Sequence, residues 1–386
     1  MKAFLIAGEP SGDALGGTLM AALASLEPGI RFAGVGGPSM AAHGLKSLFA
    51  MDELTLMGIT EVLPHYPHLV RRKNETAEAV LADEPDVLIT IDSPDFCLRV
   101  AKRVRAKAPH IPIVLYVSPS VWAWRSGRIK KLKGVVDHIL TLLPFEPAFL
   151  RGEGLSAECV GHPIVAKPLP VQSEVAAFRD RYELFDKPVL VVLPGSRKSE
   201  VKRLAGTFGE SVAQICAARR DVQVIMPAAP SVAGLVQDAI GNWPVAPIVL
   251  DPRGQDPNRS AHDKLSAFLT ADAALAASGS VSLELAATDT PMVIAYDTAW
   301  LTGQILKRML TVDTVTLVNL VSETRAVPEF LGPACRAENI AAAVLDLLDG
   351  SDAQSTAFKL TMERLGAGGE DPGLRAARSV LAQLSG

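Results

Sequence analysis

The stretch PVLVVLPGSRKSE, residues 188–200, indicates how this chain folds. A continuous apolar run is followed by proline and glycine, and then by a polar segment of the kind that begins a helix. Because the run does not alternate in polarity, it predicts a strand buried on both faces, as in a parallel sheet. AALAASGSVSLE, residues 273–284, has the same order of strand, Gly-Ser turn and helix. Such strand–helix units predict an α/β domain.

Similar apolar runs recur along the whole chain. They are AFLIAG, RFAGVGG, DVLITID, PIVLYVSP and HILTLL in the first half, and PVLVVLPG, VQVIMPA, APIVLD, AALAASG and PMVIAYD in the second. Helical patterns such as DALGGTLMAALASL and SVSLELAA lie between them. The alternation is interrupted by the proline-rich GHPIVAKPLPVQSE, residues 161–174. We therefore predict an α/β protein with two Rossmann-like parallel-sheet domains that face each other across a cleft.

The predicted boundaries follow these breaks. The N-terminal domain spans 1–163, a linker spans 164–187, and the C-terminal domain spans 188–365. A glycine-rich break, GAGGEDPG, precedes a final helix within 366–386, which could pack back on the N-terminal domain.

The composition excludes several classes of protein. A chain of 386 residues exceeds one ordinary core, and a net charge of −4 argues against a general nucleic-acid binder. The 4 cysteines have no CxxC spacing, so neither a zinc cluster nor a disulfide framework is indicated, and a reducing cytoplasm fits. No stretch approaches the roughly 20 apolar residues of a membrane-spanning helix, and the N-terminal run is too short for a signal peptide.

Polar residues follow the strands of the first half. GEPSGD, after the first strand, is predicted to form a cleft loop with Glu9, Ser11, Gly12 and Asp13. It matches neither a Walker loop nor a dinucleotide fingerprint. A purely structural interpretation stays open, in which Ser11 or Asp13 caps the following helix.

A carboxylate also follows the strand DVLIT. Asp92 lies at the end of this strand and Asp95 lies in the turn beyond it. Ligands of parallel sheets bind at the carboxyl ends of strands, so one of these groups could deprotonate a hydroxyl. Asp92 is the first choice as catalytic base, because Asp95 is better placed to cap the next helix; the sequence leaves the choice open.

The two Gly-Ser turns of the second half form a matched pair. Each has a glutamate four residues after its serine, Glu200 and Glu284, whereas a capping box places the acid three residues after the cap. Two helix starts that open on one cleft suit a diphosphate, and a downstream acid suits ribose hydroxyls. The predicted UDP-sugar-binding residues are Gly195, Ser196, Arg197, Ser278, Gly279, Ser280, Glu284 and Asn319, the last of which ends the predicted strand VTLVNL.

A diphosphate site and a single base together indicate transfer from a nucleotide sugar. Glycoside hydrolysis needs two carboxylates, whereas one base on the acceptor hydroxyl suffices when the leaving group is a nucleotide diphosphate. Direct displacement inverts the anomeric carbon. Cationic and helix-terminal groups can stabilise the leaving charge, and no DxD pair is present, so we predict no metal and no cofactor.

One segment is strongly basic. SPSVWAWRSGRIKKLKG, residues 118–134, contains two tryptophans and five basic residues, and no acid occurs from 98 to 136. Tryptophan suits a water–lipid boundary, and basic side chains suit an anionic lipid surface. The predicted acceptor and membrane residues are Trp122, Trp124, Arg125, Arg128, Lys130, Lys131 and Lys133. The alternative is a solvated helix face with the tryptophans in the core.

Several of these motifs carry a resemblance to a known family. The chain resembles lipid-A-disaccharide synthase, a bacterial GT-B glycosyltransferase family. The motifs that carry the resemblance are, in this order, AGEPSGD, MDELTLMGITEVLPH, IDSPDF, YVSPSVWAWR, LPFEPAF, GHP, LPGSR and SGSVSLE. The resemblance implies the donor UDP-2,3-diacylglucosamine, the acceptor 2,3-diacylglucosamine 1-phosphate, and a β-1′,6-linked lipid A disaccharide as the product, with UDP released. It also implies Asp92 as the base, Arg197 on the UDP phosphates, Glu284 on the ribose and Asn319 as a further cleft residue.

The resemblance also implies a location. An acylated, phosphorylated acceptor lies in the inner membrane of a Gram-negative bacterium, so the enzyme would bind that membrane peripherally from the cytoplasm. Rivals of the same fold are a UDP-GlcNAc 2-epimerase and a lipid-linked GlcNAc transferase; a non-enzymatic rival is a nucleotide- or RNA-binding module. Acyl-chain length, the surface that inserts into lipid, and a monomeric or homodimeric state stay open.

Overall fold

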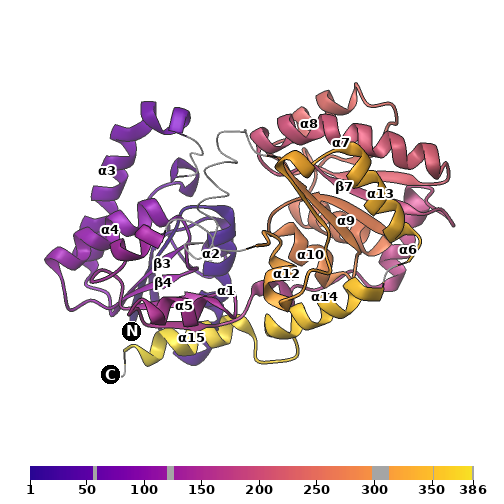
Figure 1. Cartoon of the computed structure of the whole chain (residues 1–386). Helices are drawn as coiled ribbons and strands as arrows, with labels where there is room; N and C mark the ends of the chain where they lie inside the picture. Colours follow the sequence, from indigo (N-terminus) through magenta and orange to yellow (C-terminus); the bar gives the residue numbers. More distant parts are fainter. Residues whose placement is uncertain (55–58, 120–125, 298–312, 351, 385–386) are drawn as a thin grey trace. The chain divides into compact units, whose positions relative to one another are not determined.

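The structure is a computed structural model that describes residues 1–54, 59–119, 126–297, 313–350 and 352–384. The chain divides into two compact units: Met1–Ala166 together with Leu365–Gly386, and Lys167–Arg364. Each unit contains a six-stranded parallel sheet flanked by helices (Figure 1). The predicted α/β class with two Rossmann-like sheets is confirmed.

The sheet of the first unit has the order β2-β1-β3-β4-β5-β6. Its strands are β1 Lys2–Ala7, β2 Arg31–Val35, β3 Val87–Ile91, β4 Ile113–Tyr116, β5 His138–Thr141 and β6 Ala157–Cys159. Its helices are α1 Pro10–Leu26, α2 Pro38–Ala41, α3 Ile59–Asp83, α4 Pro94–Lys107, α5 Glu146–Gly152 and α15 Pro372–Ala382, with 3₁₀ turns at Met51–Leu54, Ser126–Lys131 and Pro163–Ala166. The strand order reverses at β1 and β3, and ligands of such sheets bind at this reversal.

The strands of this unit are buried on both faces, which explains their continuous apolar runs. Phe4 and Ile6 of β1 pack in a core with residues of α3, α4 and α5. Ala3 and Leu5 of the same strand point to the other face, into a core with residues of α1, α2 and α15.

The C-terminal helix α15 belongs to the first unit and packs along α1 (Figure 1). The side chain of Ser379 donates a hydrogen bond to Glu158 at 2.6 Å and lies 3.1 Å from Nε2 of His138. Arg375 donates to the carbonyl oxygen of Cys159. Helix α15 therefore covers part of one face of the first sheet, although it is the last element of the chain.

The sheet of the second unit has the order β12-β11-β10-β7-β8-β9. Its strands are β7 Val189–Leu193, β8 Gln223–Pro227, β9 Ile248–Leu250, β10 Ala273–Ala277, β11 Met292–Tyr296 and β12 Glu329–Leu331. Its helices include α6 Gln172–Arg181, α7 Lys198–Ala218, α8 Ala233–Ile240, α9 Pro257–Thr270, α10 Val281–Ala287, α12 Leu317–Ser322, α13 Ala337–Leu348 and α14 Asp352–Arg364. Here the order reverses between β7 and β10, the two strands that precede the Gly-Ser turns.

Much of the segment predicted as a linker, 164–187, is folded into the second unit. Helix α6 packs on α9, and Arg181 at its end binds both carboxylate oxygens of Asp263, at 3.0 and 3.2 Å. The prolines of this segment precede α6, and the helix begins after them, at Gln172. In the described parts of the chain, no helix is both long enough and apolar enough to span a bilayer.

Candidate active site

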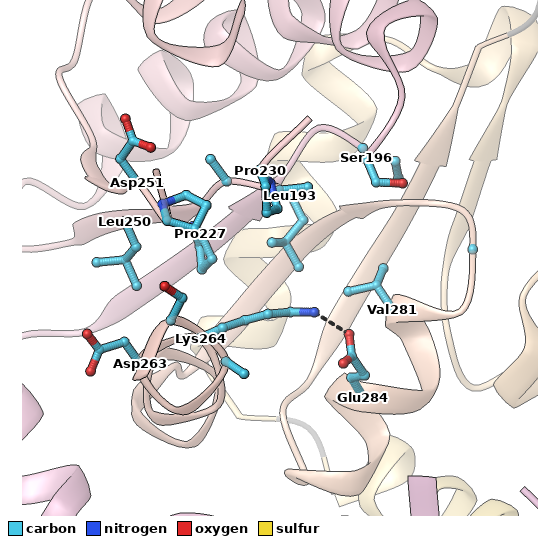
Figure 2. Close-up of a pocket in the computed structure, with 18 of the residues that line it drawn as sticks. Leu193, Ser196, Pro227, Pro230, Leu250, Asp251, Asp263, Lys264, Val281 and Glu284 are labelled. Atoms are coloured by element: carbon cyan, nitrogen blue, oxygen red, sulfur yellow. Dashed lines mark hydrogen bonds and ion pairs between the residues drawn. The ribbon is translucent and has the colours of Figure 1, made fainter. Parts of the chain in front are cut away.

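The second unit contains a pocket of about 620 Å³ at the carboxyl ends of β7, β8, β9 and β10 (Figure 2). This volume suits a small ligand. Both Gly-Ser turns line it, because β7 and β10 are neighbours in the sheet. Of the predicted UDP-sugar-binding residues, the pocket is lined by Gly195, Ser196, Arg197, Ser278, Gly279, Ser280 and Glu284.

The turn after β7 requires a correction. The sequence pattern took Ser196 as the cap, but the N-cap of α7 is Arg197, one residue later. Glu200 is therefore the third residue of the helix, and its Oε2 accepts hydrogen bonds from the backbone N–H groups of Ser196 and Arg197, at 3.1 and 3.2 Å. The prediction that Glu200 is out of register for capping was wrong, because the fold begins the helix at a different residue.

The turn after β10 differs from the first. Ser280 is the N-cap of α10, and its side chain makes no capping hydrogen bond. Glu284 lies four residues later and binds two lysines instead. Nζ of Lys264 lies 2.5 Å from Oε2 (Figure 2), and Nζ of Lys167 lies 3.3 Å from Oε1. Each carboxylate oxygen therefore has its own cation.

These lysines determine the charge of Glu284. Burial raises the pKa of the carboxyl group, but the positive charges and hydrogen bonds of Lys264 and Lys167 outweigh burial, so the net pKa lies below the ordinary 4.5. The group is ionised at neutral pH. An ionised carboxylate that is aimed into a pocket can accept hydrogen bonds from hydroxyl groups of a ligand.

Sequence reasoning missed the apolar side of this pocket. Pro227 ends β8 and is followed by Ala228, Ala229 and Pro230, and Leu250 ends β9. A flat ring can be accommodated against such small apolar side chains. The signal in the sequence was a proline in the turn after each of two strands, which by itself is typical of any loop.

Asn319 also requires a correction. VTLVNL is not a strand, because Asn319 lies in α12. Its side chain is buried: Oδ1 accepts from the N–H of Val327 at 3.0 Å, and Nδ2 donates to the carbonyl of Val327 at 2.9 Å and to Thr314 Oγ1 at 3.3 Å. The amide is absent from the pocket lining and holds together the segment that leads into β12.

In the first unit, β1 and β3 bring the two predicted motifs together. The hydroxyl of Ser11 donates to Oδ2 of Asp92 at 3.2 Å, and the N–H of Ser93 donates to Oδ1 at 2.9 Å. Asp92 and Ser93 both have left-handed backbones, with φ of 51° and 47°. Each such residue costs roughly 1–2 kcal/mol, and strained backbone of this kind is often found at functional sites.

Asp95 is placed differently. It is exposed in the first turn of α4, two residues after the N-cap Ser93. Its carboxylate suits the positive end of the helix, but the predicted role as the cap was wrong, because the N-cap of α4 is Ser93.

The segment predicted as a cleft loop is mostly helix. Glu9 is the N-cap of α1, without a side-chain capping bond, and Ser11, Gly12 and Asp13 lie in its first turn. Gly12 is buried, and a Cβ there would lie 3.2 Å from the carbonyl oxygen of Ile91. Glycine therefore allows the start of α1 to approach the end of β3.

Asp13 is buried and does not cap its own helix. Its carboxylate accepts three backbone hydrogen bonds at the start of α2, from Gly37 and Ser39 at 2.8 Å and from Met40 at 3.0 Å. The interpretation of Ser11 or Asp13 as the cap of α1 was wrong, because both residues are already inside that helix. Asp13 instead joins two helices that are distant in sequence.

Asp13→Ala is expected to lower the free energy of unfolding of the first unit by about 2–4 kcal/mol. The substitution leaves buried N–H groups without an acceptor, and each costs about 1–3 kcal/mol when it stays dry. Urea denaturation measures the loss, with Asp52→Ala as the control because Asp52 is an exposed aspartate of the same unit. A loss equal to that of the control would contradict this role.

The basic segment is only partly described. Trp122, Trp124 and Arg125 lie outside the described residues, as does the side chain of Arg128. Lys130, Lys131 and Lys133 are exposed, and Lys133 lies 3.4 Å from Glu153.

Tertiary structure neutralises other parts of the acid-free stretch 98–136. Arg103 pairs with Glu78, and Arg105 pairs with Asp137. Ile129, directly before the exposed lysines, and Leu132, between Lys131 and Lys133, are buried in the core. This arrangement is compatible with a solvated face and with a surface that meets anionic lipid.

Among the residues that the structure describes, no three His, Cys, Asp or Glu side chains are grouped so that they could hold a metal ion.

Comparison with known proteins identifies the family. A family model described as lipid-A-disaccharide synthetase matches residues 3–370. The chain belongs to the lipid-A-disaccharide synthase family. A lipid-A-disaccharide synthase of Ruegeria pomeroyi is 55% identical over 386 residues, covering 100% of this chain and 96% of the relative. One of Rhodospirillum centenum is 44% identical over 383 residues, covering 98% and 93%.

Membership in the lipid-A-disaccharide synthase family makes the chain a glycosyltransferase of lipid A biosynthesis. Solved structures show the same fold at low identity. The UDP-GlcNAc 2-epimerase of Neisseria meningitidis, bound to UDP-GlcNAc, has a TM-score of 0.66 at 11% identity and covers 99% of both chains. A glycosyltransferase of Rickettsia africae has a TM-score of 0.57 at 11% identity, covering 100% of this chain and 98% of its own. These likenesses concern the fold alone and do not favour an epimerase.

Proposed function

We propose that the chain transfers 2,3-diacylglucosamine from its UDP conjugate to 2,3-diacylglucosamine 1-phosphate. The products are the β-1′,6-linked disaccharide 1-phosphate and UDP, with inversion at the anomeric carbon. The observation that carries this proposal is the pocket of the second unit, which combines two helix starts with an ionised carboxylate. Family membership supports the lipid A substrates.

The donor is proposed to bind in this pocket. Its diphosphate would lie at the starts of α7 and α10, where backbone N–H groups and the helix dipoles favour an anion. The exposed guanidinium of Arg197 would bind a phosphate oxygen. Glu284 would accept the ribose hydroxyls, and the apolar turn 227–230 would hold the uracil ring.

Asp92 is proposed as the catalytic base. It would take the proton of the acceptor's 6-hydroxyl while that oxygen attacks the anomeric carbon, and the bond from that carbon to the UDP oxygen would break. Ser11 and the N–H of Ser93 hold the carboxylate in one orientation. A positioned general base contributes about 10²–10⁴-fold to a rate.

The test is a reaction with both purified substrates, followed by mass spectrometry of the lipid product. Formation of the disaccharide 1-phosphate with stoichiometric UDP, dependent on the acceptor, supports the proposal. Conversion of UDP-GlcNAc in the absence of an acceptor would instead indicate an epimerase. NMR of the product linkage reports the anomeric configuration and thereby tests inversion.

We also propose that the enzyme docks peripherally on the cytoplasmic face of the inner membrane. Its acceptor is an anionic amphiphile, and Lys130, Lys131 and Lys133 present exposed positive charge. Each lysine near an anionic surface contributes about 1 kcal/mol. Trp122 and Trp124 would lie at the headgroup level.

Changing Lys130, Lys131 and Lys133 together to Glu is expected to reduce binding to anionic liposomes by about 100-fold or more, because favourable charge is replaced by repulsion. Vesicle sedimentation at low and moderate salt measures the effect. The matched control changes the exposed Lys187 and Lys202 of the second unit to Glu. Equal sedimentation of wild type and the triple variant would contradict docking through this segment.

A further inference from the structure

The two Gly-Ser turns differ in whether their helix start is already occupied. At α7, one oxygen of Glu200 accepts the N–H groups of Ser196 and Arg197, and the other oxygen lies 3.3 Å from the guanidinium of Arg197. The Glu200 side chain is only 9% exposed, whereas that of Arg197 is 65% exposed. Glu200 therefore uses the donors on which a phosphate at this turn would depend.

Gly195 shows how closely the carboxylate folds back over the turn. Its backbone has a φ of +118°, and a Cβ there would lie 2.5 Å from Cβ and 2.6 Å from Oε2 of Glu200. The space above the glycine is thus filled by Glu200. A carboxylate and a phosphate have the same sign of charge and both accept hydrogen bonds, so they compete for the same N–H groups.

At α10 the arrangement is different. Ser280 provides no side-chain cap, and Glu284 is directed to Lys264 and Lys167 rather than to its own helix start. Glu200 thus covers the start of α7, whereas Glu284 binds lysines and does not fold back over the start of α10 in the same way. The two motifs, which look equivalent in sequence, are therefore expected to bind anions differently.

We propose that Glu200 is an internal competitor for the donor diphosphate: its carboxylate occupies the anion position at the start of α7 and must rotate away when a phosphate binds there. This inference rests on the proposed function, because it assumes that the pocket binds UDP. A phosphate that binds at this turn must first break the contacts of Glu200. The free energy of breaking them lowers the net affinity of the wild-type protein for the donor and for the product UDP. Glu200 is thus a residue that sets affinity, and it takes no part in the bond-making step.

The test compares Glu200→Ala and Glu200→Gln with wild type by calorimetric titration of UDP, inorganic pyrophosphate and uridine. Glu200→Ala is expected to bind UDP and pyrophosphate about 3- to 30-fold more tightly, because the N–H groups become free. Glu200→Gln keeps an acceptor without the charge and is expected to lie between the two. Uridine has no phosphate, so its affinity is expected to stay unchanged.

Glu210→Ala is the matched control, because Glu210 is an exposed glutamate of the same helix. Thermal unfolding shows that each variant is folded, and the loss of the cap should lower the midpoint of Glu200→Ala. Unchanged or weaker UDP and pyrophosphate binding by a folded Glu200→Ala would overturn the competitor role alone. Failure of wild type to bind UDP at all would remove the donor pocket and this inference with it.

Discussion

Asp92→Asn is expected to lower kcat by about 10²–10⁴-fold while the Kd for UDP stays within about twofold of wild type. The size of the loss follows from the removal of a general base. UDP binding should not change, because the proposed donor pocket lies wholly in the second unit and Asp92 belongs to the first.

The structure makes asparagine an informative replacement here. Asp92 has a left-handed backbone with φ of 51°, and asparagine tolerates this conformation better than most residues. The amide has nearly the same shape as the carboxylate and can still accept the N–H of Ser93. A loss of activity therefore reports the missing negative charge and proton acceptor. Circular dichroism and the unfolding midpoint should match wild type.

Asp95→Asn is the matched control. Asp95 is an exposed carboxylate three residues away, in the first turn of α4. Its substitution is expected to leave kcat within about threefold of wild type. An inactive Asp95→Asn beside an active Asp92→Asn would transfer the role of base to Asp95.

Glu284→Gln is expected to weaken UDP binding by about 10- to 100-fold. A hydrogen bond to a charged group contributes about 1.5–3 kcal/mol, and 1.4 kcal/mol corresponds to a factor of ten. The substitution also leaves Lys264 and Lys167 near each other without their shared anion. Calorimetric titration of UDP measures the effect.

Ligands without the full ribose provide the control for Glu284. The 2′-deoxy analogue of UDP lacks one proposed hydroxyl donor, so Glu284→Gln should weaken its binding less than that of UDP. Pyrophosphate, which has no ribose, should bind with nearly unchanged affinity. An equal loss for all three ligands would mean that Glu284 supports the pocket without contacting ribose.

The lowered pKa of Glu284 adds a dependence on pH. The carboxylate is ionised above its folded pKa, which lies below 4.5, so UDP affinity should not fall through this group between pH 8 and 5. The contribution of Glu284 to stability has the same sign: it is present above 4.5 and is lost as pH falls through the lowered pKa. Lys264→Met removes a positive charge that opposes the effect of burial, so it should raise the pKa of Glu284. The affinity for UDP should then begin to fall at a higher pH than in the wild type.

Much of this protein could be read from its sequence. Continuous apolar runs predicted buried parallel strands, since residues on both sides of such a strand must be apolar. The Gly-Ser turns after two of those runs predicted residues that the structure brings together in one pocket, because β7 and β10 are adjacent at the reversal of strand order. The contact between Asp92 and Ser11, by contrast, came only from the structure, in which β1 and β3 are neighbours.

What the sequence could not supply were the partners of these side chains. Whether Glu200 caps a helix depends on Arg197 being the N-cap of that helix, and the ionisation of Glu284 depends on Lys264, twenty positions away in the chain. Asp13 and Asn319 looked like cleft residues, and folding placed them against backbone groups of other segments. Local pattern determines which strands and turns form, because neighbouring residues carry that information. Electrostatic state and hydrogen bonding depend on groups that only the folded chain brings within a few ångströms.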